Sequence, residues 1–364
     1  MDSARPATVG SPEALALREL EAGFGRAARR QRLRRARLGL AGGTVEVEVA
    51  GEALFERLTA ALRHLALDGP DGGRAPDLRV TLWDADERPP AGPPPAPGHV
   101  PTGPPIASAS PDGRFVLHRR THAVVAMDRA RGSVAGWFRD VDRLPLYDRG
   151  RPLHPQLLLW NQDRGAPPLH AGLVARGGRG ALFVGEGGSG KTTSALACLL
   201  HGFDFLGDDY VSLRGRPGGG FAGHGVYGST HVAPDHLARF PALVPHAVAP
   251  VWEGEDKAVV FLADVHPGRL ARESPIDALF LPTVRSGATR VRPATPAQAV
   301  LRLVQGALAL ATHAGSGRME TLFRLAAATP AFWLDLGAEL DEIPLVVQRT
   351  LDGLPPADPA GREP

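Results

Sequence analysis

The chain has 364 residues, enough for two domains with a large core, and 43% of them are hydrophobic, as in ordinary globular proteins. A formal net charge of +2 is too small for a protein that binds nucleic acid mainly through basic charge. Cys198 is the only cysteine, so no internal disulfide can form, and we expect a reducing cytoplasm. The sequence has neither a signal peptide nor an apolar run of about 18 residues, so we expect no membrane partner.

The N-terminal part predicts a small α+β domain over residues 13–88, after a disordered tail at 1–12. Apolar periodicity predicts, in chain order, a helix over 13–38, a strand over 45–49, a helix over 54–65 and a strand over 78–83. Seven arginines lie between Arg26 and Arg37. They would form either a solvated basic face or a dock for an acidic peptide or nucleic acid.

Residues 89–105 are so rich in proline that they cannot form a helix or an inner strand, and we expect an exposed linker. Residues 106–148 follow as a predicted antiparallel meander. Its three strand-like runs are 114–120, 122–130 and 133–140, and a helix over 152–163 comes next.

A complete phosphate-binding loop, Gly185-Glu-Gly-Gly-Ser-Gly190-Lys191-Thr192, stands between a short apolar strand and a helix. Its glycines let backbone N–H groups turn towards phosphate oxygens, and the following helix points its positive end at the anion. The lysine adds a charge near the β- and γ-phosphates, and the threonine hydroxyl can bind Mg²⁺. The predicted nucleotide-binding residues are Gly185, Gly187, Gly188, Ser189, Gly190, Lys191, Thr192 and Thr193.

Two adjacent carboxylates, Asp208 and Asp209, follow the loop lysine after 17 residues, about the length of one helix and one strand. Two acids next to a phosphate loop indicate phosphoryl transfer. Lys191 and Lys257 are the only lysines among 41 Lys and Arg residues. Either lysine was kept at these positions because arginine would not serve there, or it was left by drift. Lys257 is therefore a candidate catalytic residue, with a plain surface lysine as the alternative.

The domain over 149–352 is predicted to carry these motifs, and 353–364 to be a tail. Glycines at 177–178 predict a turn between two strands, and 215–225 predict a mobile glycine-rich loop. A capping box at Thr295 opens a predicted helix to about residue 311. The remaining predicted elements are strands over 169–176, 180–184, 210–213, 259–262, 277–281 and 332–336 and a helix over 341–351.

Three stretches together resemble the kinase domain of HPr kinase/phosphorylase: Leu169-His170-Ala-Gly172, the phosphate loop, and Phe203-Asp-Phe-Leu-Gly-Asp208-Asp209-Tyr-Val. They are more similar still to the HPr-kinase-like serine kinases encoded beside bacterial peptide natural-product genes, including lasso-peptide clusters. In that family a strand histidine lies 15 residues before the first loop glycine, as His170 lies before Gly185. The Asp-Asp spacing also agrees.

This resemblance implies an α/β fold, with a P-loop kinase domain of the HPr kinase/phosphoenolpyruvate carboxykinase type after a smaller α+β domain. It implies an ATP-dependent phosphotransferase that acts on a serine hydroxyl of a peptide or small protein. Thr192 and Asp208 would bind Mg²⁺, Asp209 would accept the proton of the attacking hydroxyl, and His170 would orient or stabilise the transfer.

The chain also departs from that family. The acid-x-x-Arg-Gly run that binds substrate in true HPr kinases has no clear counterpart, and residues 224–231 occupy its region. HPr itself, reversal by phosphorolysis and a hexamer are therefore not implied. Two alternatives stay open: a small-molecule kinase of the shikimate-kinase type, and a regulatory module that binds ATP without transferring phosphate. The sequence names neither the acceptor nor the oligomeric state.

Overall fold

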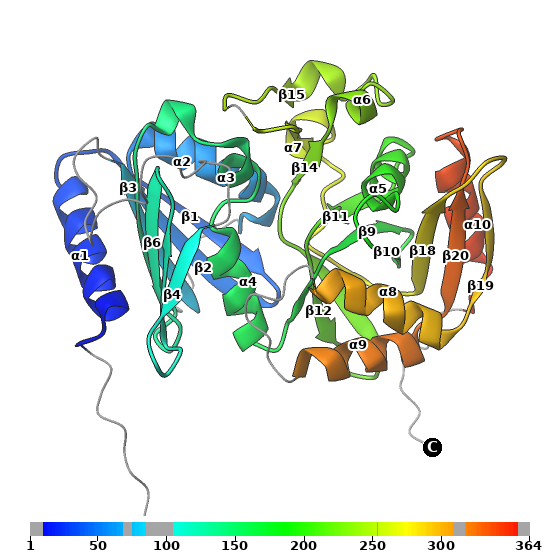
Figure 1. Ribbon diagram of the computed structural model, residues 1–364, viewed down its shortest axis with the longest axis horizontal. Helices are drawn as coiled ribbons and strands as arrows, with labels where there is room; N and C mark the ends of the chain where they lie inside the picture. The colour runs from blue at the N-terminus through cyan, green and yellow to red at the C-terminus, as the bar shows by residue number, and fades with distance from the viewer. Residues whose placement is uncertain (1–9, 68–74, 85–104, 253, 309–316, 356–364) are drawn as a thin grey trace, which may run out of the picture. The chain divides into compact units, whose positions relative to one another are not determined.

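The computed structural model describes residues 10–67, 75–84, 105–252, 254–308 and 317–355 (Figure 1). The chain forms two compact units. Unit 1 comprises Met1–Trp160 and Ala233–Val259, and unit 2 comprises Asn161–Val232 and Val260–Pro364. The predicted proline-rich linker lies outside the described residues except for Pro105, and so do both predicted tails for the most part.

Unit 1 is built on a seven-stranded mixed sheet in the order β1-β2-β3-β7-β6-β5-β4. Its strands are β1 (Leu33–Leu40), β2 (Gly43–Ala50), β3 (Leu78–Asp84), β4 (Ile106–Ala109), β5 (Phe115–Arg119), β6 (Ala123–Asp128) and β7 (Ser133–Phe138). The predicted meander is confirmed, because β5, β6 and β7 pair antiparallel in sequence order. However, β3 and β7 pair in parallel, so the ranges 13–88 and 106–148 share one sheet rather than forming separate bodies.

Helix α1 (Pro12–Ala27) covers one face of this sheet, where its Leu17 and Leu20 pack with Leu117 and Trp137. The helices of the unit also include α2 (Glu52–Thr59), a 3₁₀ turn (Ala60–Leu65), α3 (Leu146–Gly150) and the start of α4 (His154–Asp163). The prediction of a helix through residue 38 was wrong. Beyond Ala27 the chain pairs with β2 along its whole length as β1, and this pairing overrides the helix propensity of its arginines.

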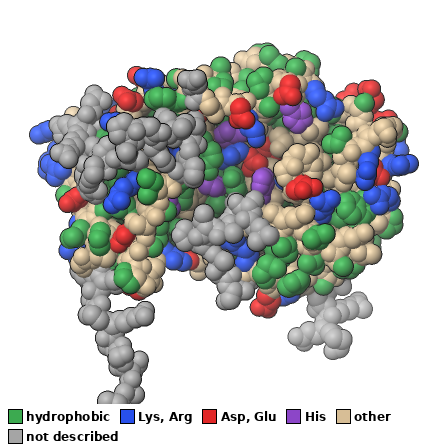
Figure 2. Space-filling model, viewed as in Figure 1, with side chains coloured by type: hydrophobic (Ala, Val, Ile, Leu, Met, Phe, Trp, Pro, Cys, Tyr) green, Lys and Arg blue, Asp and Glu red, His purple; other side chains and the backbone are tan. Residues whose placement is uncertain are grey.

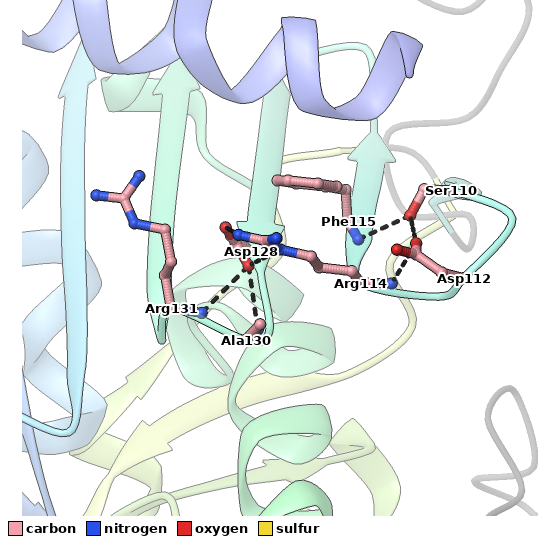
Figure 3. A network of polar contacts seen from close by, with 7 residues as sticks. All are labelled: Ser110, Asp112, Arg114, Phe115, Asp128, Ala130 and Arg131. Carbon is pink, nitrogen blue, oxygen red and sulfur yellow. Dashed lines mark hydrogen bonds and ion pairs between the residues drawn. The ribbon is translucent and has the colours of Figure 1, made fainter. Parts of the chain in front are cut away.

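The turns of the meander are held by a local polar network (Figure 3). The buried carboxylate of Asp128, at the end of β6, accepts hydrogen bonds from Arg114 Nε and Nη2 at 2.9 and 2.8 Å. It also accepts the backbone N–H groups of Ala130 and Arg131 at 3.0 and 3.2 Å. In the preceding turn, Ser110 Oγ donates to Asp112 and accepts from the backbone N–H of Phe115.

Unit 2 contains a six-stranded sheet in the order β11-β9-β10-β18-β20-β19 and a four-stranded sheet in the order β17-β13-β12-β8. The first consists of β9 (Ala171–Arg176), β10 (Arg179–Val184), β11 (Asp204–Gly207), β18 (Ala278–Val284), β19 (Arg290–Ala294) and β20 (Ala331–Leu336). The second consists of β8 (Pro168–Leu169), β12 (Val211–Gly215), β13 (Phe221–Gly225) and β17 (Glu273–Pro275). At the centre of the six-stranded sheet, β10, β18 and β20 run parallel.

Helices cover both faces of the six-stranded sheet. On one face α5 (Lys191–Leu200) packs against β9, β10 and β11, beside α10 (Glu342–Asp352). On the other, α8 (Pro296–Leu308) and α9 (Gly317–Ala328) share a buried core with the four-stranded sheet. The outer strand β19 is charged: Arg290 and Arg292 both reach Asp335, and Figure 2 shows basic side chains gathered over this edge. Such charges protect an edge strand from further pairing.

Several local predictions in this unit are confirmed. Gly177 and Gly178 both have positive φ and join β9 to β10 as a two-residue hairpin turn. The capping box forms, since Thr295 and Gln298 exchange backbone-to-side-chain hydrogen bonds at 3.0 and 3.3 Å. The glycine-rich segment 215–225 is only partly a loop, because residues 221–225 form β13 and pair with β12.

The remaining elements are short. They are α6 (Pro234–Leu237), β14 (Ser229–Val232), β15 (Ala247–Val248), β16 (Ala258–Phe261), α7 (Leu262–Val265) and two 3₁₀ turns, Val141–Arg143 and Val244–His246. In the part of the chain that is described, no helix is both long and apolar enough to cross a membrane.

Candidate active site

The phosphate loop lies where the sequence predicts it, between the carboxyl end of β10 and the start of α5. Gly188 and Gly190 have φ values of 77° and 105°, which favour glycine. A Cβ at Gly190 would lie 2.2 Å from Leu336 Cδ1 at the end of β20. The loop therefore rests on the carboxyl ends of the parallel strands, the edge at which open α/β sheets bind ligands.

Lys191 is buried, and its ammonium group donates to the carbonyl oxygens of Gly185 and Glu186 at 3.0 and 2.9 Å. Both acceptors belong to the loop itself. The ammonium of Lys191 is thus held inside the loop, where its charge would complement a bound phosphate. Glu186 points its carboxylate to Arg302 of α8 instead, at 3.2 Å.

The loop also has the space and the donors that phosphate requires. A Cβ at Gly187 or Gly188 would have no atom within 4 Å, so the backbone there borders open space. The hydroxyl oxygen of Ser189 is buried and has no hydrogen-bond partner within the described residues. An orphaned hydroxyl beside open, glycine-lined backbone fits a bound oxyanion. Thr192, at the first turn of α5, is partly exposed, and Thr193 is buried.

His170 lies at a point where the chain passes from one sheet to the other. Leu169 before it belongs to β8 of the four-stranded sheet, and Ala171 after it begins β9 of the six-stranded sheet. Asp208, Asp209 and Tyr210 make the reverse passage, from β11 to β12. The two passages are adjacent, because β8 pairs with β12 and β9 with β11.

This double crossing brings the histidine and the acid pair together. His170 Nε2 lies 3.1 Å from Asp209 Oδ1, and both side chains are partly exposed. Asp208 is 3% exposed and accepts a 2.5 Å hydrogen bond from the hydroxyl of buried Thr230. The two acids therefore differ in environment: one is buried and fixed, and the other faces outward beside an imidazole.

The strand register places the acid pair, the histidine and the phosphate loop at one edge of the sheet. Val184, the residue before the loop, pairs with Ala171, the residue after His170. Gly207, the residue before Asp208, pairs with Leu173 of the same strand. Since β9 is antiparallel to both neighbours, its start and their ends meet at one edge, with about 4.8 Å between adjacent strands.

Residues that could hold Mg²⁺ are Thr192 and Asp208, a hydroxyl and a carboxylate, which are the hard oxygen ligands that this ion prefers. Across the residues described, no group of three or more His, Cys, Asp or Glu side chains is placed to bind a metal by itself. An ion carried in by nucleotide phosphates needs only one or two protein ligands, with phosphate and water oxygens as the others. The donor set fits that arrangement.

Lys257 is exposed and precedes β16, within the segment Ala233–Val259 that belongs to unit 1. It belongs to a different unit from the other candidate residues, and its role stays a prediction. Cys198 is buried on α5, and this burial raises the pKa of its thiol, as expected of a structural cysteine.

Two features of the site escaped the sequence analysis. Thr230, which binds Asp208, lies in the segment 224–231 that was noted only as replacing a family signature. Tyr210 places its ring 5.8 Å from the ring of His170, and the ring of Tyr227 meets it edge-on at 6.4 Å. No sequence motif marks these contacts. The only signal in the sequence was position, since Tyr210 follows the acid pair and Tyr227 and Thr230 lie in the segment 224–231, where the chain differs from the family.

Comparisons with known proteins do not identify a family for this chain. No protein-family model matches the chain. No curated protein matches it. Among solved structures, the HPr(Ser) kinase/phosphatase from Coxiella burnetii is similar at a TM-score of 0.28 and 11% sequence identity, over 50% of this chain and 95% of that chain. At so low a TM-score the likeness carries no argument about fold or activity, so the function has to be inferred from the site.

Proposed function

We propose that this chain is an ATP-dependent kinase that transfers the γ-phosphoryl group to a serine hydroxyl of a peptide or small protein. The observation that carries the proposal is the single sheet edge shared by the phosphate loop, His170 and the Asp208-Asp209 pair. A phosphate loop alone binds nucleotide. Where such a loop lies next to a histidine–carboxylate pair, the carboxylate can also accept the proton of an attacking hydroxyl.

The roles follow from the environments. The loop N–H groups and Lys191 would bind the β- and γ-phosphates of ATP, and Thr192 and Asp208 would hold Mg²⁺. Mg²⁺, when bound, neutralises the phosphate charge. Asp208 suits this role because it is buried and held by Thr230. Asp209 suits the role of general base, because a base must reach the acceptor hydroxyl and this carboxylate is partly exposed.

His170 would position that base. Its Nε2 lies 3.1 Å from Asp209 Oδ1, so its ring would fix the orientation of the carboxylate. The hydroxyl proton passes to Asp209 as the serine oxygen bonds to the γ-phosphorus and the bond to the β-phosphate oxygen breaks. ADP leaves, and the proton on Asp209 returns to water. The serine acceptor comes from the family resemblance and not from the geometry.

The test is incubation of the full chain with ATP, Mg²⁺ and peptides encoded by neighbouring genes, followed by intact-mass measurement. A phosphate added to a serine-containing peptide, and absent with Asp209→Asn, supports the proposal. Phosphate appearing only on small metabolites would assign the chain to the small-molecule kinases. ATP binding without transfer to any acceptor would make it a regulatory module.

A further inference from the structure

Helix α8 contacts the phosphate loop through a residue that the proposed mechanism does not use. Arg302 Nη1 donates to Glu186 Oε1 at 3.2 Å and to Gln305 Oε1 at 3.1 Å. The Glu186 side chain is largely exposed, but the Arg302 side chain is only 18% exposed. The carbonyl oxygen of Glu186 is also one of the two that accept hydrogen bonds from Lys191. Arg302 therefore fixes the side chain of a residue whose backbone holds the loop lysine.

A second contact restricts the guanidinium group of Arg302. It lies over the ring of Trp333 in β20, at 5.4 Å from the ring centroid. The indole N–H of Trp333 donates to Gln298 Oε1 at 3.1 Å, and Gln298 precedes Arg302 by one turn of α8. Stacking on an aromatic ring orients the planar guanidinium. This orientation lowers the side-chain entropy that is lost on pairing with Glu186, which is a main cost of an exposed ion pair.

One turn further along α8, Gly306 brings the helix against the backbone of His170. A glycine inside a helix is unfavourable relative to alanine, so its presence requires a reason. A Cβ at Gly306 would lie 2.8 Å from the carbonyl oxygen of His170 and 3.4 Å from Leu169 Cδ1. Any larger residue would force the helix or this backbone to move. The close approach of α8 to His170 therefore depends on glycine.

We propose that α8 sets the distance between the phosphate loop and His170, with Arg302 and Gly306 as positioning residues. They are four positions apart, so they lie on the same face of the helix. One fixes Glu186 of the loop, and the other allows close contact with the histidine backbone. Reacting groups tolerate only small errors in distance and angle, so a helix that contacts both parts controls their geometry. The inference rests on the proposed function, because it concerns the same site.

Amide hydrogen exchange of the nucleotide-free chain tests the loop contact without relying on ATP binding. Arg302→Gln and Glu186→Gln should each speed exchange over residues 185–190, and the double variant should be no faster than the faster single variant. Arg302→Lys should restore part of the protection, because it keeps the charge. Arg292→Gln is the matched control, since Arg292 lies over the same tryptophan ring but pairs with Asp335. Unchanged exchange in Arg302→Gln would overturn the proposal.

ATP affinity in the same variants separates two roles of Glu186. If the ion pair positions the loop, Arg302→Gln and Glu186→Gln should both weaken ATP binding, by about two- to five-fold in calorimetry. Tighter binding by Glu186→Gln would show that this carboxylate repels phosphate, and would overturn the positioning role. A wild-type chain that binds no ATP would instead contradict the proposed function, and hydrogen exchange would still decide the loop contact.

Turnover at saturating ATP tests the contact with His170. Gly306→Ala should lower it roughly ten-fold, with a smaller change in ATP affinity, because the helix or the histidine backbone must shift. Gly25→Ala is the matched control, since Gly25 lies in α1 and a Cβ there would have no atom within 4 Å. Wild-type turnover by folded Gly306→Ala would overturn the proposal. If Gly306→Ala does not fold, the exchange measured in Arg302→Gln decides it.

Discussion

Asp128 of unit 1 and Asp209 of unit 2 show two uses of a carboxylate paired with a basic side chain. Asp128 is 1% exposed, and Arg114 and the backbone of its own turn supply its donors (Figure 3). Asp209 lies where the chain crosses between two sheets, is partly exposed, and faces His170 from another strand. Burial and ion pairing are common to structural acids, whereas the carboxyl edge of an α/β sheet is where a functional acid is expected.

The largest effect is expected at the phosphate loop. Lys191→Ala should lower affinity for ATP with Mg²⁺ by at least about 10²-fold, because the variant lacks the buried ammonium that would contact phosphate under this proposal. Titration calorimetry on the folded variant measures this. Arg131→Gln is the control, since it removes an exposed cation of unit 1 and should leave nucleotide affinity unchanged. Equal ATP affinities in wild type and Lys191→Ala would contradict the assignment of the nucleotide site to this loop.

Asp128→Ala should instead act on stability alone, lowering the free energy of unfolding because Arg114 and the backbone N–H groups of Ala130 and Arg131 lose their acceptor. Chemical denaturation checks the size of the loss, and ATP binding should be retained. A loss of ATP binding in the folded variant would contradict the purely structural role given to Asp128.

The structural role of Asp128 also has a pH signature. Burial acts to raise the pKa of Asp128, but the hydrogen bonds from Arg114 and from the backbone N–H of Arg131 outweigh it, so the pKa is lowered from 3.8. A lowered pKa stabilises the fold above the unfolded value and loses that effect as pH falls through the folded value. The stability difference between wild type and Asp128→Asn should therefore shrink below about pH 4. A constant difference down to pH 2–3 would contradict a charge-based role.

What could be predicted from the sequence was local. The phosphate loop, the turn at Gly177-Gly178 and the capping box at Thr295 form through residues close in sequence, and each was recognised. The strand β1 was mistaken for helix because its partner, β2, decides its conformation. Likewise, the Thr230–Asp208 contact depends on long-range packing that no spacing rule encodes.

His170 shows the same difference between local sequence features and long-range contacts. The spacing of His170 pointed to a role, and the structure supplies the reason for its contact with Asp209, namely two adjacent passages between sheets. His170→Ala should lower turnover roughly ten-fold, as for loss of a residue that orients another, and leave ATP affinity unchanged. A wild-type kcat in His170→Ala would show that His170 has only a structural role.

The smallest effect is expected at Lys257, which is exposed and belongs to unit 1. If it contacts phosphate or acceptor, Lys257→Ala should lower turnover by about five-fold at most, the range of a surface charge contact. Lys257→Arg should restore it only partly, because a planar guanidinium does not replace a compact ammonium. Full activity in both variants would return Lys257 to a plain surface residue.

The central claim, that the acid at the sheet edge takes the proton of the acceptor, is tested most directly by comparing Asp209→Asn with Asp128→Asn. Phosphoryl transfer from labelled ATP is measured in both, at saturating nucleotide and at a temperature where both are folded. The account predicts a loss of about 10²-fold or more for Asp209→Asn with ATP still bound, and near wild-type transfer for Asp128→Asn. Wild-type transfer by Asp209→Asn would contradict it.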